Sequence, residues 1–387
     1  MSNESIVERL KGQEGSQVVL TVFRKSENRT FRMRLQRDRV PIRSIDAYDM
    51  LRPDMGYIRM NRFAESTFEE FKESLRDLVG QGARKLVLDL RDNPGGYLNI
   101  AEGIADTFLP EGKIILFTKN KKGQVEKTFA TSRGGFENKP VYVLINERSA
   151  SASEIIAGAL QDNDIGTIVG RRSFGKGLVQ REMDLGDGSA VRLTVSRYYT
   201  PTGRSIQRDY HNGSEDYYQT YMERYHNGEL TTVDSIKVAD SLKFTTPKGK
   251  VVYGGGGIIP DVFVPIGSNE EEALEALDAR GYFAAFAFEH LEEDRGRYAG
   301  YTAEEFFSDF STDDILFEEL MDYVGGYSFN MDFYQHEDLL KQYVKAAIAE
   351  QLFSPDLKAK ILAPADRMLQ KVIELDSPTL QSKDIDL

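Results

Sequence analysis

The chain of 387 residues contains no cysteine and only four histidines. Without a thiol it has no cysteine nucleophile, no disulfide and no cysteine-based zinc or iron–sulfur site. Absence of cysteine also suits an oxidising envelope compartment. The histidines form no HExxH motif and no other close pair of metal ligands, so the sequence predicts no metal site. They are His211, His226, His290 and His336.

Long apolar runs are also missing. No stretch reaches the roughly 18 apolar residues that indicate a membrane-spanning helix. The first residues, MSNESIVERLKG, show neither the basic nor the apolar region of a signal peptide. Hydrophobic residues make up 40% of the chain and charged residues 29%, a balance typical of a folded globular protein. The length predicts two or three domains.

The chain is acidic, and its charge is unevenly distributed. A net charge of −13 argues against a nucleic-acid-binding protein, which needs a basic face. Residues 1–40 carry 9 basic and 5 acidic side chains, a net charge of +4. Residues 267–387 carry 10 basic and 27 acidic side chains, a net charge of −17, and residues 41–266 balance to zero. This division predicts three units with these boundaries.

Each unit has its own pattern of expected elements. Residues 2–40 read as a helix and two strands, too little to close a core, so we expect the end of a domain whose beginning is missing. Residues 41–266 alternate buried strands and amphipathic helices, which predicts an α/β core. Residues 267–387 read as mainly helical. Capping boxes are expected at Ser66 with Glu69 and at Ser268 with Glu271.

Three segments of the α/β region could carry chemistry. DLRDNPGG (89–96) and RSASASEI (148–155) each lie between a buried strand and a helix, where ligands gather in α/β sheets. Taken alone, the first is also compatible with a simple glycine turn, and the second with a serine helix cap. The functional alternative is a serine nucleophile at a helix start, with the amide of Ala152 contributing to an oxyanion hole.

The third segment is GRRSFGKGLVQ (170–180). It resembles a phosphate-binding loop but has Gly177 where magnesium requires Ser or Thr, and a strand follows instead of a helix, so no nucleotide is expected. A lone lysine is usually a solvated surface charge. Lys176, however, lies between two glycines in an apolar stretch. Burial there would lower its pKa and leave a neutral amine that can act as a general base.

Taken together, these segments resemble the C-terminal processing peptidases, or tail-specific proteases, serine endopeptidases of the S41 type with a Ser–Lys dyad. The family pattern S-A-S-A-S-E is followed by F-G-K-G-x-V-Q, with the lysine 25 residues after the middle serine, as Lys176 follows Ser151. D-L-R-x-N-P-G-G, R-Y-Y-T-P-x-G and G-G-G-I-I-P-D are also present. Any one of these motifs alone would be weak, but their spacing is specific.

The resemblance implies a role for each motif residue. Ser151 would be the nucleophile and Lys176 the general base, with Gln180 orienting the amine. The backbone amides of Gly96 and Ala152 would form the oxyanion hole. Such a dyad requires no metal, nucleotide or other cofactor. Ser149 and Ser153 would cap the helix or pack against it. Glu154 lies in the first helical turn, where the helix dipole favours a carboxylate, and it would have a structural role.

The resemblance also implies a fold and a setting. The fold class is α/β, with a crotonase-like tail-protease core, a partial PDZ segment at residues 1–40 and a helical C-terminal region. The segment corresponds to the second half of a PDZ domain, and the carboxylate-binding loop of the first half is absent. The partners would be protein or peptide substrates with C-terminal tails, in the cell envelope or periplasm. The acidic C-terminal region is a candidate for homo-oligomer formation.

Two alternatives remain open. One is a catalytically silent peptide-binding or adaptor protein on the same fold, against which the complete set of Ser151, Lys176 and Gln180 argues. The other is a Ser-His-Asp hydrolase acting on small esters, which would depend on His211 or His226. The sequence contains no G-x-S-x-G elbow, but triads assemble in space rather than in sequence.

Overall fold

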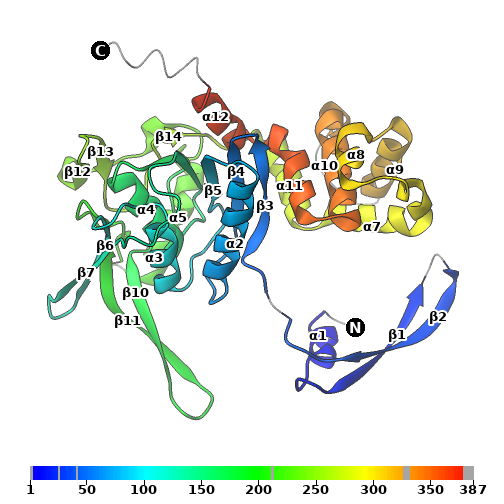
Figure 1. Cartoon of the computed structure of the whole chain (residues 1–387), viewed down its shortest axis with the longest axis horizontal. Coiled ribbons are helices and arrows are strands. Elements are labelled where there is room, and N and C mark those ends of the chain that lie inside the picture. Colours follow the sequence, from blue (N-terminus) through cyan, green and yellow to red (C-terminus); the bar gives the residue numbers. More distant parts are fainter. Residues whose placement is uncertain (1–2, 25–26, 41, 211–212, 326–331, 378–387) are drawn as a thin grey trace. The chain divides into compact units, whose positions relative to one another are not determined.

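The computed structural model describes residues 3–24, 27–40, 42–210, 213–325 and 332–377 (Figure 1). The chain divides into two compact units. One unit combines Met1–Arg43 with Ala276–Ser354, and the other combines Ser44–Glu275 with Pro355–Leu387. Each unit is described separately. The prediction of three domains at 1–40, 41–266 and 267–387 stays a prediction.

The larger unit is built on a six-stranded sheet. Its strands follow the order β14-β9-β8-β5-β4-β3, and only β3 runs antiparallel to its neighbour. The mixed α/β class expected from the sequence is therefore present. The strands are β3 (Ile45–Arg52), β4 (Met55–Met60), β5 (Lys85–Asp89), β8 (Val141–Ile145), β9 (Gly166–Gly170) and β14 (Val262–Phe263).

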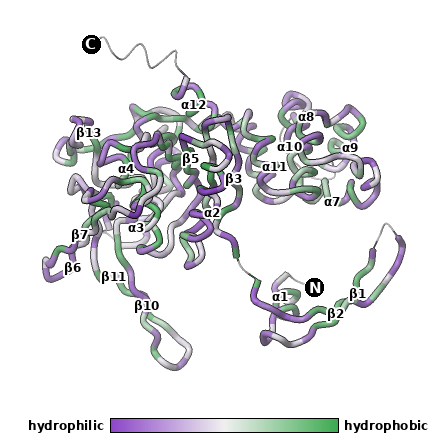
Figure 2. The backbone as a smooth tube through the Cα atoms, viewed as in Figure 1, coloured by the Kyte–Doolittle hydropathy of each residue, from purple (hydrophilic) through white to green (hydrophobic). Residues whose placement is uncertain are grey.

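Helices cover both faces of this sheet, which explains the continuous apolar run of β5 (Figure 2). Leu86 and Leu88 point into one buried cluster and Val87 into the other, because successive strand side chains alternate. The first cluster contains residues of α2 (Thr67–Gly80), α3 (Leu98–Asp106) and α4 (Ala152–Asp162). The second contains residues of η6 (Ala363–Ala365) and α12 (Arg367–Leu375), and α11 (Pro355–Leu362) packs beside β3.

A second sheet has the order β10-β11-β6-β7 and is antiparallel throughout. Its strands are β6 (Ile114–Asn120), β7 (Val125–Phe129), β10 (Leu178–Asp184) and β11 (Ala190–Tyr199). The β10–β11 hairpin predicted around residues 186–188 is confirmed. Strand β10 is an edge strand of this sheet, and it follows directly on the loop that contains Lys176.

An insertion between β11 and β14 was not predicted. It contains α5 (Ser214–His226), η2 (Val233–Ser235), η3 (Asp240–Leu242), β12 (Lys243–Thr245) and β13 (Val251–Tyr253). Helix α5 has no aliphatic stripe: its two buried residues are Tyr217 and Arg224. Hydrophobic periodicity, the main sequence signal of a helix, is therefore weak there.

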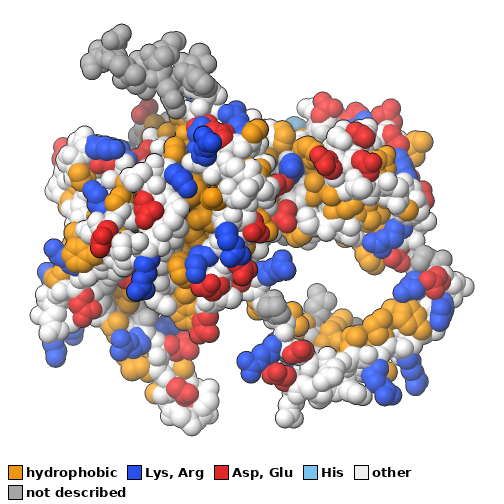
Figure 3. All heavy atoms as spheres, in the orientation of Figure 1, with side chains coloured by type: hydrophobic (Ala, Val, Ile, Leu, Met, Phe, Trp, Pro, Cys, Tyr) orange, Lys and Arg blue, Asp and Glu red, His pale blue; other side chains and the backbone are white. Residues whose placement is uncertain are grey.

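The other unit contains α1 (Asn3–Leu10) and the antiparallel pair β1 (Gln17–Arg24) and β2 (Arg29–Gln36), so the predicted helix and two strands are confirmed. It also contains a helical part matching the expected helices. Asp and Glu side chains gather over α8 and α9 (Figure 3). The helices are α7 (Tyr282–Asp294), η4 (Arg295–Tyr298), α8 (Ala303–Asp309), α9 (Asp314–Gly325), η5 (Phe333–His336) and α10 (Glu337–Leu352), and α6 (Asn269–Ala279) spans the boundary between the units.

The two predicted capping boxes have different outcomes. At the start of α6, Ser268 N donates to Glu271 and Glu271 N donates to Ser268, which confirms the box. At α2 the prediction is wrong, because Ser66 Oγ donates to Glu70 Oε1 at 2.6 Å instead of capping the helix. None of the described helices has the length and apolar character needed to cross a membrane.

Candidate active site

The loop after β5 is held in a tight, glycine-dependent conformation. Asn93 donates to Met60 O at 2.9 Å and accepts from Gly95 N at 2.9 Å. The φ of Gly96 is +156°, and a Cβ there would lie 2.1 Å from Phe63 O. A Cβ on Gly95 would lie 2.8 Å from Ala152 N. The two glycines therefore let this loop lie directly against the start of α4.

Ser151 lies at the start of α4 in a strained conformation. Its φ of 56° and ψ of −109° are unusual for a residue with a Cβ. Strain of this kind persists only where the surroundings impose it, and it is concentrated at functional sites.

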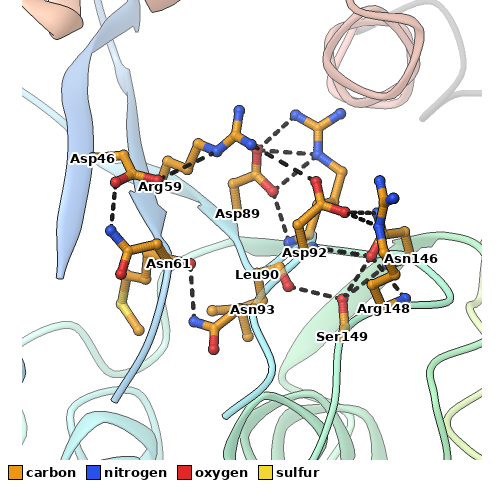
Figure 4. Close-up of polar contacts among 12 residues, drawn as sticks. Asp46, Arg59, Asn61, Asp89, Leu90, Asp92, Asn93, Asn146, Arg148 and Ser149 are labelled. Carbon is orange, nitrogen blue, oxygen red and sulfur yellow. Dashed lines mark hydrogen bonds and ion pairs between the residues drawn. The ribbon is translucent and has the colours of Figure 1, made fainter. Parts of the chain in front are cut away.

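Polar contacts join the loops on either side of Ser151. Ser149 Oγ donates to Leu90 O at 2.7 Å, and Ser153 Oγ donates to Asn93 O at 3.0 Å. Asp92 accepts from Asn146 at 2.8 Å, and Figure 4 shows these side chains converging between the two loops. Arg148 and Arg59 form ion pairs with the same Asp92. The first two candidate segments therefore form one polar network.

Glu154 connects the Ser151 turn to the Lys176 loop. Its carboxylate is fully buried and accepts hydrogen bonds from the amides of Ser151, Gly175 and Lys176 at 2.8, 2.7 and 2.8 Å. Ser173 Oγ donates to it as well, at 2.5 Å. Burial raises the pKa of Glu154, and these hydrogen bonds oppose that rise. The sequence pointed to a dipole effect alone, whereas the structure gives this side chain four hydrogen-bond donors.

Lys176 is half-buried on the loop between β9 and β10. Burial lowers the pKa of its amine, Arg192 lowers it further, and Glu154 opposes the shift. The ammonium has no hydrogen-bond or ion-pair partner among the residues that the structure describes. A half-buried amine without a counter-ion loses its proton more readily than a solvated lysine.

All five residues implied by the resemblance line one cavity of about 520 Å³. Ser151 and Ala152 come from the start of α4, and Gly96 comes from the loop after β5. Lys176 comes from the loop between β9 and β10, and Gln180 from β10 itself. The cavity thus brings together three segments that are far apart in the sequence.

The contacts inside this cavity are incomplete. In the described part of the chain, no hydrogen bond joins the side chains of Ser151, Lys176 and Gln180 to one another. The backbone amides of Gly96 and Ala152 have no acceptor among the described residues, which leaves both available to an oxyanion. Catalytic hydrogen bonds are often long before substrate binds, so the geometry is compatible with a resting site.

Two further residues support the site and were missed. Tyr198 OH donates to Ser151 O at 3.1 Å, and burial raises the pKa of this phenol well above its usual value. Arg224 of α5 donates to Ser173 O and Gly256 O, both at 2.7 Å. Tyr198 belongs to the RYYTP motif, which was a usable signal, whereas nothing in the sequence around Arg224 indicated its contacts.

A histidine-dependent site receives no support. His211 lies outside the described residues. His226 is the last residue of α5 and is not among the described residues that line the cavity.

The part of the chain that contains this cavity is similar to known peptidases. Residues 54–213 match the model of peptidase family S41, which confirms the resemblance drawn from the motifs. Residues 273–354 match a family of unknown function, DUF8443.

Curated relatives carry the corresponding names. The chain is 38% identical over 205 residues to the carboxy-terminal-processing protease of Bartonella bacilliformis, covering 52% of this chain and 47% of the relative. It is 34% identical over 202 residues to the carboxy-terminal processing protease CtpB of Bacillus subtilis, covering 52% and 42%. The matches therefore span about half of this chain and less than half of these relatives. A solved photosystem II D1 C-terminal processing protease matches with 28% identity and a TM-score of 0.42, covering 66% of this chain and 57% of that one.

Proposed function

We propose that this chain is a serine endopeptidase that cleaves protein substrates near their C-terminal tails through a Ser–Lys dyad. The observation that carries the proposal is the convergence of Ser151, Lys176, Gln180, Gly96 and Ala152 on one cavity. The lowered pKa of Lys176 supports its role as base, because only the neutral amine can accept a proton. The C-terminal processing relatives support the preference for tails.

The reaction has two halves. Ser151 Oγ attacks the scissile carbonyl carbon while its proton passes to Lys176 Nζ, and Gln180 orients the amine. The oxyanion accepts hydrogen bonds from Gly96 N and Ala152 N. The C–N bond then breaks, and the leaving amine takes the proton from Lys176. Water next attacks the acyl-enzyme with Lys176 as base, which releases the acid and restores Ser151.

A digestion of unfolded casein tests this function. The parent protein is compared with Ser151→Ala and Lys176→Ala, with EDTA present and no nucleotide. We expect cleavage by the parent and loss of cleavage in both variants. Lys119→Ala, which alters an exposed lysine of β6, should retain parental activity. Cleavage that survives in either dyad variant would refute the dyad.

The alternative is a catalytically silent peptide-binding protein on the same fold. No hydrogen bond joins the side chains of Ser151 and Lys176 within the described residues, an arrangement that a silent site shares with a resting one. A folded parent that binds peptides but cleaves neither casein nor an activated ester would establish this alternative.

The finer fold and the setting follow from the resemblance. We infer a crotonase-like tail-protease core, a mainly helical C-terminal region and a PDZ-like C-terminal half at residues 1–40. Met33 and Leu35 are exposed apolar side chains on one face of the hairpin, and they support its packing against further strands. Fusing a PDZ N-terminal half before residue 1 should protect the β1 amides from hydrogen exchange. We infer location in the cell envelope, which fractionation of cells expressing the gene would test.

A further inference from the structure

A second and larger cavity, of about 1180 Å³, adjoins the candidate active site. Both cavities are lined by Pro94, Lys176, Leu178 and Gln180. The residues that line both cavities connect the two spaces. An extended peptide advances about 3.3 Å per residue, so residues only a few positions from a scissile bond at Ser151 could reach the larger cavity. The larger cavity is therefore within reach of the residues next to the cleaved bond.

Aromatic rings dominate one side of this cavity. Helix α5 supplies three of them, and the rings contact one another at centroid distances of 5.0 Å for Phe174 with Tyr221 and 5.6 Å for Tyr217 with Tyr218. Tyr218 is 60% exposed, so its ring is free to cover a ligand. The aromatic lining consists of Phe174, Tyr210, Tyr217, Tyr218 and Tyr221. Rings of this kind bind large apolar side chains with little loss of entropy.

The same cavity is positively charged, although the chain as a whole has a net charge of −13. Arg208 is buried over the rings of Phe174 and Tyr217, at 4.4 and 4.0 Å, and its Nε and Nη2 have no hydrogen-bond partner among the described residues. Arg197 is exposed on β11, and no ion pair involves it within the described chain. Asp209 is the acidic residue of the lining, so the guanidinium groups of Arg197 and Arg208 give a potential that favours an anion.

We propose that this cavity is a substrate subsite, which binds a large apolar side chain together with a carboxylate close to the scissile bond. The inference rests on the proposed function, because it assigns the cavity to the same reaction. Tyr218 contacts the apolar side chain, and Arg197 pairs with the carboxylate. The carboxylate comes from either of two sources, the free C-terminus of the substrate or an Asp or Glu side chain.

A set of short labelled peptides separates these features. One peptide has an aromatic residue near a free C-terminus, and a second replaces that residue by alanine. A third carries an amidated C-terminus, and a fourth is amidated but has an internal glutamate. We expect kcat/KM to fall at least about tenfold without the aromatic ring. Amidation should lower it about three- to fivefold. If kcat/KM recovers in the fourth peptide, the bound carboxylate is that of a side chain. If kcat/KM does not recover, the bound carboxylate is the free C-terminus.

Two variants with matched controls test the residues. Tyr218→Ala should remove the preference for the aromatic peptide, whereas Tyr225→Ala should keep it, because Tyr225 is an exposed tyrosine of the same helix outside the cavity lining. Arg197→Glu should reverse the preference so that the amidated peptide is cleaved faster. Arg181→Glu, on the neighbouring strand and outside the lining, should leave the preference unchanged.

Binding to the Ser151→Ala protein separates the two proposals. If the peptides bind this variant with the expected preferences but the parent does not cleave them, the proposed function fails and the subsite stands. If the parent cleaves all four peptides equally and neither variant changes the ratios, the subsite is refuted and the proposed function stands.

Discussion

The carboxylate of Glu154 accepts a hydrogen bond of 2.8 Å from the backbone amide of Lys176. The same carboxylate accepts the amide of Ser151 at 2.8 Å. One buried side chain therefore fixes the distance between the backbones of the two residues proposed as base and nucleophile. This spacing is independent of the side-chain rotamers of Ser151 and Lys176, because it acts on their backbones.

Glu154→Gln should weaken both the fold and the activity. The amide retains one acceptor oxygen for four donors, so buried N–H groups are left unpaired at a cost of about 1–3 kcal/mol. We expect the free energy of unfolding measured in urea to fall by this amount. We also expect kcat to fall at least tenfold, because catalysis is sensitive to misplaced groups. Glu102→Gln, at a half-buried glutamate with one hydrogen bond to Thr128, should change neither strongly. Unchanged kcat in Glu154→Gln would contradict the positioning role.

Lys176→Arg should abolish peptide cleavage while leaving the protein folded. A guanidinium keeps the positive charge but cannot give up a proton, so it cannot serve as a base. The measurement is initial cleavage rate alongside the circular dichroism spectrum. A folded variant that retains near-parental rate would remove lysine from the mechanism.

The pH profile should reflect the lowered pKa of Lys176. Cleavage requires the neutral amine, so kcat/KM should rise with pH and level off below the ordinary lysine value of 10.5. Arg192 lowers this pKa and is paired with Glu182 at 2.6 Å. Arg192→Gln removes that cation and leaves Glu182 unpaired, so the rising limb should move to higher pH. Arg181→Gln is the control, and a shift of the same size there would argue against the local effect.

Gly96→Ala should remove activity. The added Cβ would meet Phe63 O at 2.1 Å, so the loop must move and the proposed oxyanion amide with it. Gly123→Ala shares a positive φ, of +81°, but has nothing within 4 Å, so it should cost only about 1 kcal/mol of stability and no activity. Comparable activity in the two variants would show that Gly96 N does not contribute to catalysis.

Arg204→Met should destabilise the larger unit strongly. Arg204 and Asp162 are both fully buried and form an ion pair at 2.7 Å. Removing one partner leaves a buried charge, which costs about 3–5 kcal/mol. Replacing both, as Arg204→Met with Asp162→Leu, should recover part of that loss in urea titrations. A double variant less stable than the single one would point to the hydrogen bonds that Asp162 accepts from Thr202 N and Thr202 Oγ1.

Strong local patterns in the sequence were sufficient to predict several elements. The apolar run of β5 and the hairpin turn before β11 follow from side-chain periodicity and turn residues, which act between near neighbours. Motif spacing was also sufficient to relate Ser151 to Lys176 and to recover the S41 resemblance. Helix α5 was missed because its buried residues are a tyrosine and an arginine, which give no apolar stripe.

Contacts between residues distant in the sequence could not be predicted and depend on the tertiary structure. The burial of Glu154 and its four donors depend on α4 and the 173–176 loop lying side by side. The positive aromatic cavity arises in the same way, from Arg197 on β11 and Tyr218 on α5 lining one space. A sequence pattern reports preferences over a few residues, whereas burial, pKa and unpaired donors are set by contacts across the whole fold.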